Sequence, residues 1–237
     1  MQRPLIIALD LADRAKRKTF LAPFKEHPAY VKVGMELFYQ EGPAIIEELK
    51  GDGHRIFLDL KLHDIPNTVN RAMRVLARLE IDLVNVHAAG GGKMMEAARE
   101  GLEAGTLSGM TRPKLLAVTQ LTSTDQMMVT EELLINRPLE EVVAIYAKNA
   151  QRSGLDGVVC SALEVPLLHE TCGSDFLTVT PGIRQLHDDR SDQHRVVTPQ
   201  KARQLGSWGI VVGRSITQAE DPFLTYVTMK KEWEGQS

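Results

Sequence analysis

Eight short runs of apolar and β-branched residues recur along the chain, and this repetition constrains the fold more than any other feature. The segments between them carry apolar residues at the spacing that predicts helices, at 43–50, 66–79, 92–105, 139–154 and 198–206. Strands that alternate with helices are typical of βαβ units with a parallel sheet. The expected strands lie at residues 5–10, 30–34, 56–61, 83–88, 115–120, 157–161, 176–180 and 209–213.

The number of strands separates two α/β architectures. A doubly wound sheet usually has about five to seven strands, whereas a (β/α)8 barrel needs eight and roughly 250 residues. The chain has 237 residues, and no linker rich in Pro, Gly or Ser divides it. The prediction is therefore an α/β protein with a single (β/α)8 TIM barrel domain that spans residues 1–237.

Charge and hydropathy exclude several classes of partner. A net charge of −3 offers no broad basic surface for nucleic acid or an anionic membrane. No run approaches the roughly 18 to 20 apolar residues of a membrane span, and Asp10 interrupts the N-terminal apolar stretch before it reaches signal-peptide length. We expect a cytoplasmic protein. Cys160 and Cys172 are too few and too isolated for a zinc site or a disulfide framework, and we expect neither metal nor cofactor.

Charged residues gather at the ends of the first three expected strands. Barrel active sites lie at the carboxyl ends of the strands, and Asp10, Lys32, Asp59 and Lys61 all lie at or near such ends. Strand side chains alternate, so Asp59 and Lys61 share the inner side while the leucines beside them face the helices. Asp64 follows in the next loop. A purely structural ion-pair network is the alternative, but the position at the catalytic face favours a functional site.

The loops after the last two expected strands have the chemistry of a phosphate site. Barrels often bind phosphate with these loops, and here Gly182 precedes Arg184 while Gly213 precedes Arg214. Glycine lets the backbone approach an anion, and a guanidinium suits a phosphate dianion. The alternative is a plain turn with a solvated arginine. The polar residues 185–195 between the two loops are typical of a lid.

The segment FLDLKLHDIPNT at residues 57–68 resembles the signature D-x-K-x-x-D-[IV]-x-x-T of the orotidine 5'-monophosphate decarboxylase family. The resemblance extends over essentially the whole chain and is greatest to the short bacterial form of the family. The other similar blocks, in the same order, are IALD (7–10), VKVGMELF (31–38), VNVHAAGG (84–91), VTQLTS (118–123), VTPGIR (179–184) and VVGRSI (211–216).

The resemblance implies cofactor-independent decarboxylation of orotidine 5'-monophosphate to UMP. Loss of CO2 leaves a carbanion at C6 of the pyrimidine, so the protein must hold fixed cations there and deliver a proton. Lys61 is the expected proton donor, because Asp59 and Asp64 on either side favour its charged form. Lys32 completes the alternating Lys32-Asp59-Lys61-Asp64 array. The resemblance also implies a homodimer in which Asp64 reaches the active site of the neighbouring subunit.

The resemblance further implies which residues contact the substrate. The ribose hydroxyls would bond Asp10 and Lys32, with Thr68 on the far side of that pocket and Ile65 beside Asp64 in the signature. Thr122 would read the edge of the pyrimidine, and Pro181 would pack against the base. The phosphate would lie against Gln193, Gly213, Arg214 and Arg184.

Three alternatives remain open at this stage. A magnesium-dependent phosphosugar enzyme of the same superfamily, such as 3-keto-gulonate 6-phosphate decarboxylase or a hexulose phosphate synthase, carries a metal-binding glutamate where this chain has Lys32. A Schiff-base aldolase would need a neutral Lys61, which two flanking aspartates disfavour. A nucleotide-binding barrel without catalysis would need a broken charged array. His63 is interpreted as structural, and Gly90 to Gly92 as a helix-entry turn.

Overall fold

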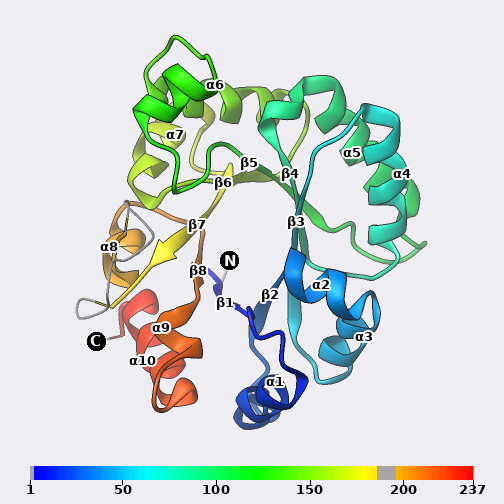
Figure 1. The fold of residues 1–237 in the computed structure, drawn as a ribbon, viewed down its shortest axis with the longest axis vertical. Coiled ribbons are helices and arrows are strands. Elements are labelled where there is room, and N and C mark those ends of the chain that lie inside the picture. The colour runs from blue at the N-terminus through cyan, green and yellow to red at the C-terminus, as the bar shows by residue number, and fades with distance from the viewer. Residues whose placement is uncertain (1–2, 186–195, 237) are drawn as a thin grey trace.

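The strands form a closed barrel. The computed structural model describes residues 3–185 and 196–236. Within these residues eight parallel strands pair in chain order, and β1 pairs with both β2 and β8. Figure 1 looks along the barrel and shows the helices as a ring around the strands. The predicted (β/α)8 barrel is therefore confirmed.

The strands lie where the apolar runs predicted them, and β7 shows the main difference. It continues beyond the predicted end at Thr180, through Pro181, to Ile183. Proline has no N–H to donate, and the β7–β8 pairing is irregular between Thr180 and Ile183. The strands are β1 Leu5–Ala8, β2 Tyr30–Gly34, β3 Arg55–Leu62, β4 Leu83–His87, β5 Lys114–Val118, β6 Gly157–Val159, β7 Leu177–Ile183 and β8 Gly209–Val212.

The helices pack outside the strands. All five predicted helical segments are helices, and the triglycine lies at the start of α5, as expected for a helix-entry turn. The helices are α1 Arg14–Leu21, α2 Met35–Glu41, α3 Ala44–Gly51, α4 Pro66–Ala77, α5 Gly91–Gly105, α6 Leu139–Arg152, α7 Val165–Cys172, α8 Pro199–Gln204, α9 Arg214–Thr217 and α10 Pro222–Glu234. None of the helices in the described part of the chain is both long and apolar enough to cross a membrane.

Two apolar layers hold the barrel together. The inner layer fills the lumen with side chains that include Ile6, Phe57 and Leu116. The outer layer lies between strands and helices, and its members include Leu58 and Leu60, the two neighbours of Asp59. The alternation predicted for β3 is therefore observed, with the leucines facing the helices.

Helices α4 and α5 pack so closely that their backbones nearly touch. A Cβ atom added to Gly101 would lie 2.2 Å from the carbonyl oxygen of Asn70, and one added to Gly105 would lie 2.3 Å from that of Arg74. Both glycines lie on one face of α5, four residues apart, so neither places a side chain between α5 and the backbone of α4. Any larger residue at either position would force the two helices apart.

The first and last described segments of the chain are joined at the face opposite the carboxyl ends of the strands. The indole N–H of Trp233, near the end of α10, donates a hydrogen bond of 3.0 Å to the backbone oxygen of Arg3, just before β1. Trp233 is buried, so this bond anchors the last helix against the first strand.

Candidate active site

The charged side chains at the carboxyl ends of β1 to β3 form a continuous chain of ion pairs. The Nζ atom of Lys32 lies 3.3 Å from Asp10 Oδ1 and 3.4 Å from Asp59 Oδ2. Lys61 Nζ lies 2.7 Å from the other oxygen of Asp59. The carboxylate of Asp59 thus bridges two lysines from neighbouring strands.

Burial makes this chain electrostatically strong at its centre and weak at its outer end. The side chains of Asp59 and Lys32 are 11% and 13% exposed, whereas that of Asp10 is 60% exposed. Burial by itself would raise the pKa of Asp59. The nearby charges of Lys32 and Lys61, together with hydrogen bonds from Lys61 and Asn85, outweigh it and hold the pKa below its usual range. Asp59 is therefore ionised at neutral pH.

Lys61 adopts a backbone conformation that is rare for a residue with a side chain. Its φ is 52°, in the left-handed region, which typically costs about 1 kcal/mol or more for a residue other than glycine. The β3–β4 pairing is irregular here: Leu58 pairs with Val84 and Leu62 with Val86. Three residues of β3 therefore lie opposite the single residue Asn85, and this bulge directs the lysine into the barrel mouth.

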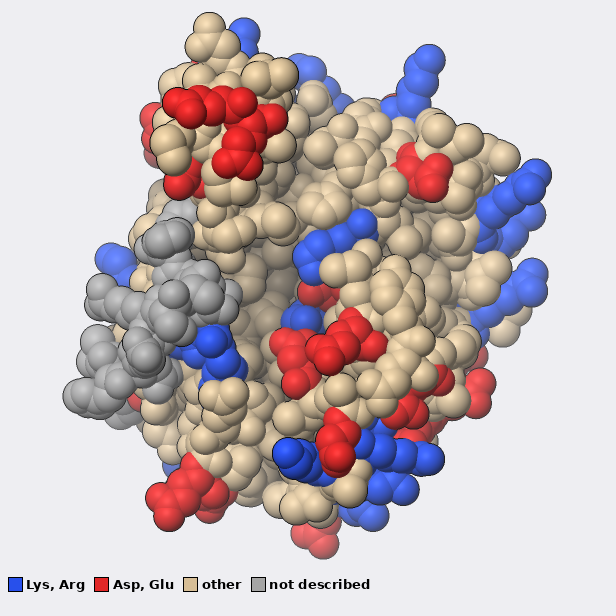
Figure 2. All heavy atoms as spheres, in the orientation of Figure 1, with Lys and Arg blue, Asp and Glu red and all other residues tan. Residues whose placement is uncertain are grey.

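A cavity of about 260 Å³ lies beside the ion-pair chain. Lys32, Asp59 and Lys61 line it, and so do two further predicted substrate contacts, Thr122 and Pro181. Figure 2 shows this face of the molecule hollowed in its middle, with acidic and basic side chains next to one another at the edge of the hollow. The apolar part of the lining consists of Phe57, Val118, Leu121, Val159 and Val211. The site thus combines an apolar floor with fixed charges on one side.

A family model matches residues 3–226, and its description is "Orotidine 5'-phosphate decarboxylase / HUMPS family". The chain belongs to this family. It is 62% identical over 235 residues to the orotidine 5'-phosphate decarboxylase of Halalkalibacterium halodurans, covering 99% of this chain and 100% of the relative. A protein of the same name from Shouchella clausii is also 62% identical, over 99% of this chain and 98% of its own length.

Solved structures agree with the family assignment. The crystal structure of orotidine 5'-phosphate decarboxylase from Lactobacillus acidophilus superimposes with a TM-score of 0.88 at 48% identity, covering 98% of this chain and 99% of that one. An uncharacterized conserved protein from Geobacillus kaustophilus gives the same TM-score at 58% identity, covering 97% and 100%.

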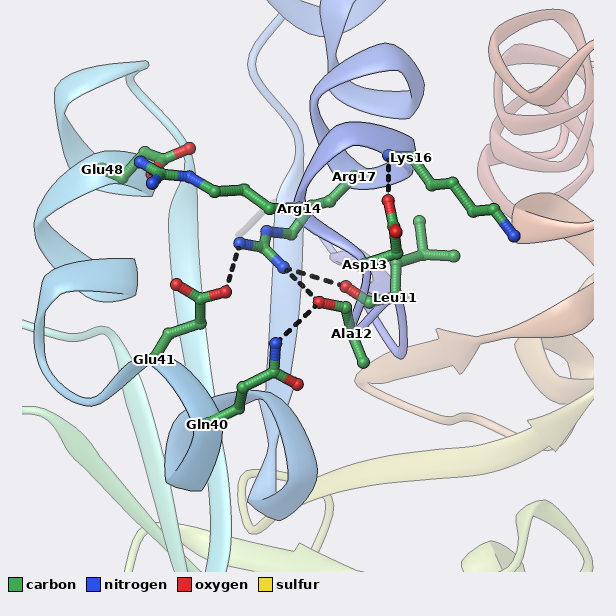
Figure 3. Close-up of polar contacts among 9 residues, drawn as sticks. All are labelled: Leu11, Ala12, Asp13, Arg14, Lys16, Arg17, Gln40, Glu41 and Glu48. Atoms are coloured by element: carbon green, nitrogen blue, oxygen red, sulfur yellow. Dashed lines mark hydrogen bonds and ion pairs between the residues drawn. The ribbon is translucent and has the colours of Figure 1, made fainter.

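The loop that carries Asp10 is held by a buried arginine. Arg17, on α1, donates from one nitrogen to the backbone oxygens of Leu11 and Ala12, at 3.0 and 3.3 Å, and from another to Glu41 at 3.1 Å. Gln40 donates to the same oxygen of Ala12 at 3.1 Å. Figure 3 shows these donors converging on the loop from α1 and α2. These hydrogen bonds therefore hold the backbone that follows Asp10, at the exposed end of the ion-pair chain.

The two arginine-bearing loops expected to bind phosphate leave neighbouring strands. Ile183 of β7 pairs with Val212 of β8, so Arg184 and Gly213 each follow one member of this pair. Arg214 is the first residue of α9, directly after Gly213, and Arg184 is buried. Gln193, together with most of the expected lid at 185–195, lies outside the described residues.

Three signature residues lie away from the cavity within this one chain. Asp64, Ile65 and Thr68 are all exposed, and the side chain of Asp64 accepts a 2.6 Å hydrogen bond from the backbone N–H of Ile65. Of the ion pairs between described residues, none joins Asp64 to Lys61. Within a single chain Asp64 therefore does not pair with Lys61, and its expected contribution to the site of a neighbouring subunit stays a prediction.

Asn85 is the main site residue that sequence reasoning missed. It is wholly buried in β4, donates from Nδ2 to Asp59 Oδ1 at 2.7 Å and accepts at Oδ1 from the backbone N–H of Lys61 at 2.8 Å. A signal was present, because a polar residue interrupts the apolar run LVNVH at an inward position. Cys160 is buried and also lines the cavity.

Two histidines lie next to the lysine end of the array. The rings of His63 and His87 are 5.8 Å apart. The pKa of His87 is lowered, mainly by burial and then by the nearby His63 and Lys61, while the charge of Asp59 acts in the opposite direction. His87 is therefore neutral at pH 7. In the described part of the chain, no three His, Cys, Asp or Glu side chains are grouped so that they could hold a metal ion.

Proposed function

We propose that this protein converts orotidine 5'-monophosphate to UMP and CO2, without a cofactor. Membership of the decarboxylase family and 62% identity to curated decarboxylases over the full chain support the reaction. The observation that carries the proposal is the buried Lys32-Asp59-Lys61 ion-pair chain on the wall of an apolar cavity. A cytoplasmic location is part of the proposal.

The substrate would lie across the barrel mouth with its phosphate at β7 and β8. Arg184, Gly213 and Arg214 would hold the phosphate, together with Gln193. The base would enter the apolar part of the cavity beside Pro181 and Thr122, both of which line it. The ribose hydroxyls would then reach the exposed end of the array, where Asp10 and Lys32 form an ion pair of 3.3 Å.

Lys61 would act as the proton donor. When the bond between C6 and the carboxylate breaks, its electron pair stays on C6 and CO2 leaves. A proton from Lys61 Nζ then forms the C6–H bond of UMP, and the neutral lysine regains a proton from water. Asp59 Oδ1 lies 2.7 Å from Nζ and limits where the ammonium can point.

The working unit in this proposal is a homodimer in which Asp64 completes the array of the neighbouring subunit. Two observations support it. Asp64 is exposed and lies outside the ion-pair chain of its own subunit, and the adjacent Ile65 is an apolar side chain that is 66% exposed. Thr68 lies on the same exposed rim. In the dimer each subunit would cover the exposed rim of the other, and Asp64 of one subunit would lie next to Lys61 of the other.

The proton-donor assignment is tested with Lys61→Ala. Turnover of orotidine 5'-monophosphate, followed by pyrimidine absorbance, should fall by at least about 10³-fold, because general-acid catalysis contributes on this order and the charge is lost as well. The Kd of UMP should change little, since the lysine acts on the reacting carbon. A variant that keeps near-normal kcat would contradict the role of Lys61.

Wild-type activity should persist in EDTA. Activity that disappears in EDTA and returns with magnesium would favour the phosphosugar alternative.

A further inference from the structure

The side chain of Asn85 joins the two central groups of the site. Its Nδ2 donates to Asp59 Oδ1 and its Oδ1 accepts from the backbone N–H of Lys61. The residue is wholly buried, and a buried amide is stable only when its donor and acceptor are both satisfied. Here both ends of the amide are used within the ion-pair array, and none of the array's own charges lies on β4.

The bulge in β3 explains why the amide is needed. Between the Leu58–Val84 and Leu62–Val86 pairs the regular ladder is interrupted. In an uninterrupted ladder a backbone carbonyl of β4 would accept from this part of β3. The Oδ1 atom of Asn85 takes that place for Lys61, whose φ of 52° departs from the extended strand conformation. The side chain thus stabilises the turn that aims Lys61 at the cavity.

The same amide fixes the rotation of the Asp59 carboxylate. Asp59 Oδ1 accepts from both Asn85 and Lys61, at 2.7 Å each, while Oδ2 faces Lys32 at 3.4 Å. Without Asn85 the carboxylate could rotate about its terminal bond and exchange its two oxygens between the lysines. With Asn85 in place, one oxygen is assigned to each lysine.

We propose that Asn85 is a positioning residue for the decarboxylation, setting the backbone of Lys61 and the carboxylate of Asp59 with one side chain. The proposal rests on Lys61 being the proton donor. It attributes no contact with substrate to Asn85, which acts only through its two partners. A neutral amide suits this place, because a carboxylate there would repel Asp59 and could not donate to it.

Two variants separate the two hydrogen bonds. Asn85→Ala removes both, whereas Asn85→Asp keeps an acceptor for the Lys61 N–H but replaces the donor to Asp59 with a second carboxylate. The matched control is Asn70→Ala, since Asn70 is an amide on α4 that donates to the backbone oxygen of Ala97 at 3.0 Å, away from the cavity. All three are compared with wild type as the assembled, folded protein, checked by thermal unfolding.

For Asn85→Ala we expect kcat to fall by about 10²-fold, because a misplacement of about 1 Å at a reacting group has this effect. The KM and the Kd of UMP should stay within about threefold of wild type, since binding contacts are untouched. The acid limb of the kcat–pH profile should move to higher pH, and further for Asn85→Asp, because Asp59 loses a donor that favours its ionised form. The other titratable or charged groups around Asp59 are Lys32, Lys61 and His87.

The proposal is overturned if kcat and the acid limb of Asn85→Ala match those of Asn70→Ala. It is also overturned if kcat and UMP affinity fall in parallel with the fraction of folded protein, which would indicate a structural role only. Lys61→Ala is assayed alongside: if that variant still turns over, the proton-donor assignment has failed, independently of what Asn85 does.

Discussion

Single residues in this protein carry functions that their neighbours in sequence do not share. Leu60 and Lys61 are adjacent, yet one packs against the helices and the other lines the cavity. Strand alternation places the two side chains on opposite sides, and the backbone of Lys61 is further defined by one unusual φ angle and by one amide from the next strand. Such a conformation persists only where the surroundings determine it, so the catalytic geometry is a property of the residue together with its partners.

Arg214 provides a residue-scale prediction. Arg214→Ala should raise the KM for orotidine 5'-monophosphate by about 10²-fold or more, because a charge-assisted bidentate contact to the phosphate is lost. The corresponding nucleoside, which has no phosphate, should be converted at nearly the wild-type kcat/KM. Steady-state kinetics with both substrates check this. Equal losses on the two substrates would refute the phosphate assignment.

Site residues could be predicted where their charge conflicts with a buried position. Lys32 and Asp59 stand out in apolar strands, and both are found in the ion-pair chain. Asn85 also interrupts an apolar run, but its role could not be assigned, because one of its two partners is the backbone N–H of a residue in a bulge. The bulge cannot be predicted from the alternation of apolar and polar residues in the strand.

At the scale of elements, the strands were more predictable than the helices. A buried parallel strand is a short apolar run wherever it occurs, so its place is visible in the sequence. Helix α1 buries only Arg17, Phe20 and Leu21, and α10 only Tyr226, Met229 and Trp233. Neither forms a broad apolar stripe, and both depend on their neighbours in the barrel for stability.

The contact between α4 and α5 provides an element-scale prediction. Gly101→Ala should lower the free energy of unfolding by about 1–3 kcal/mol, because the added methyl group meets the backbone of Asn70 and forces the helices apart. The matched control is Gly92→Ala in the first turn of the same helix, where the nearest atom would be 3.5 Å away. The Gly92→Ala change should leave the free energy of unfolding unchanged or raise it, since alanine is a better helix former than glycine by up to about 1 kcal/mol.

Urea unfolding of both variants measures the difference. If Gly101→Ala proved as stable as Gly92→Ala, the close approach of the two helices would not be a feature of the folded protein.

At the scale of the whole molecule, the array is distributed over neighbouring strands and, as proposed, over two subunits. Asp64→Ala and Lys61→Ala should each be inactive. Mixed under conditions that allow subunit exchange, they should recover activity towards half of wild type per heterodimer. One site then carries both changes and the other carries neither. Decarboxylase activity during exchange, with labelled subunits to quantify heterodimers, checks this.

If Asp64 served its own subunit, every site in the heterodimer would keep one damaged residue. Mixing would then restore nothing, even after exchange had been demonstrated.

The hydrogen bond between Trp233 and Arg3 has a practical consequence for handling this barrel. Arg3 and Trp233 both lie on the side away from the mouth, so a surface tether attached through either of these two segments would leave substrate access open. The molecule is thus suited to immobilisation from this side.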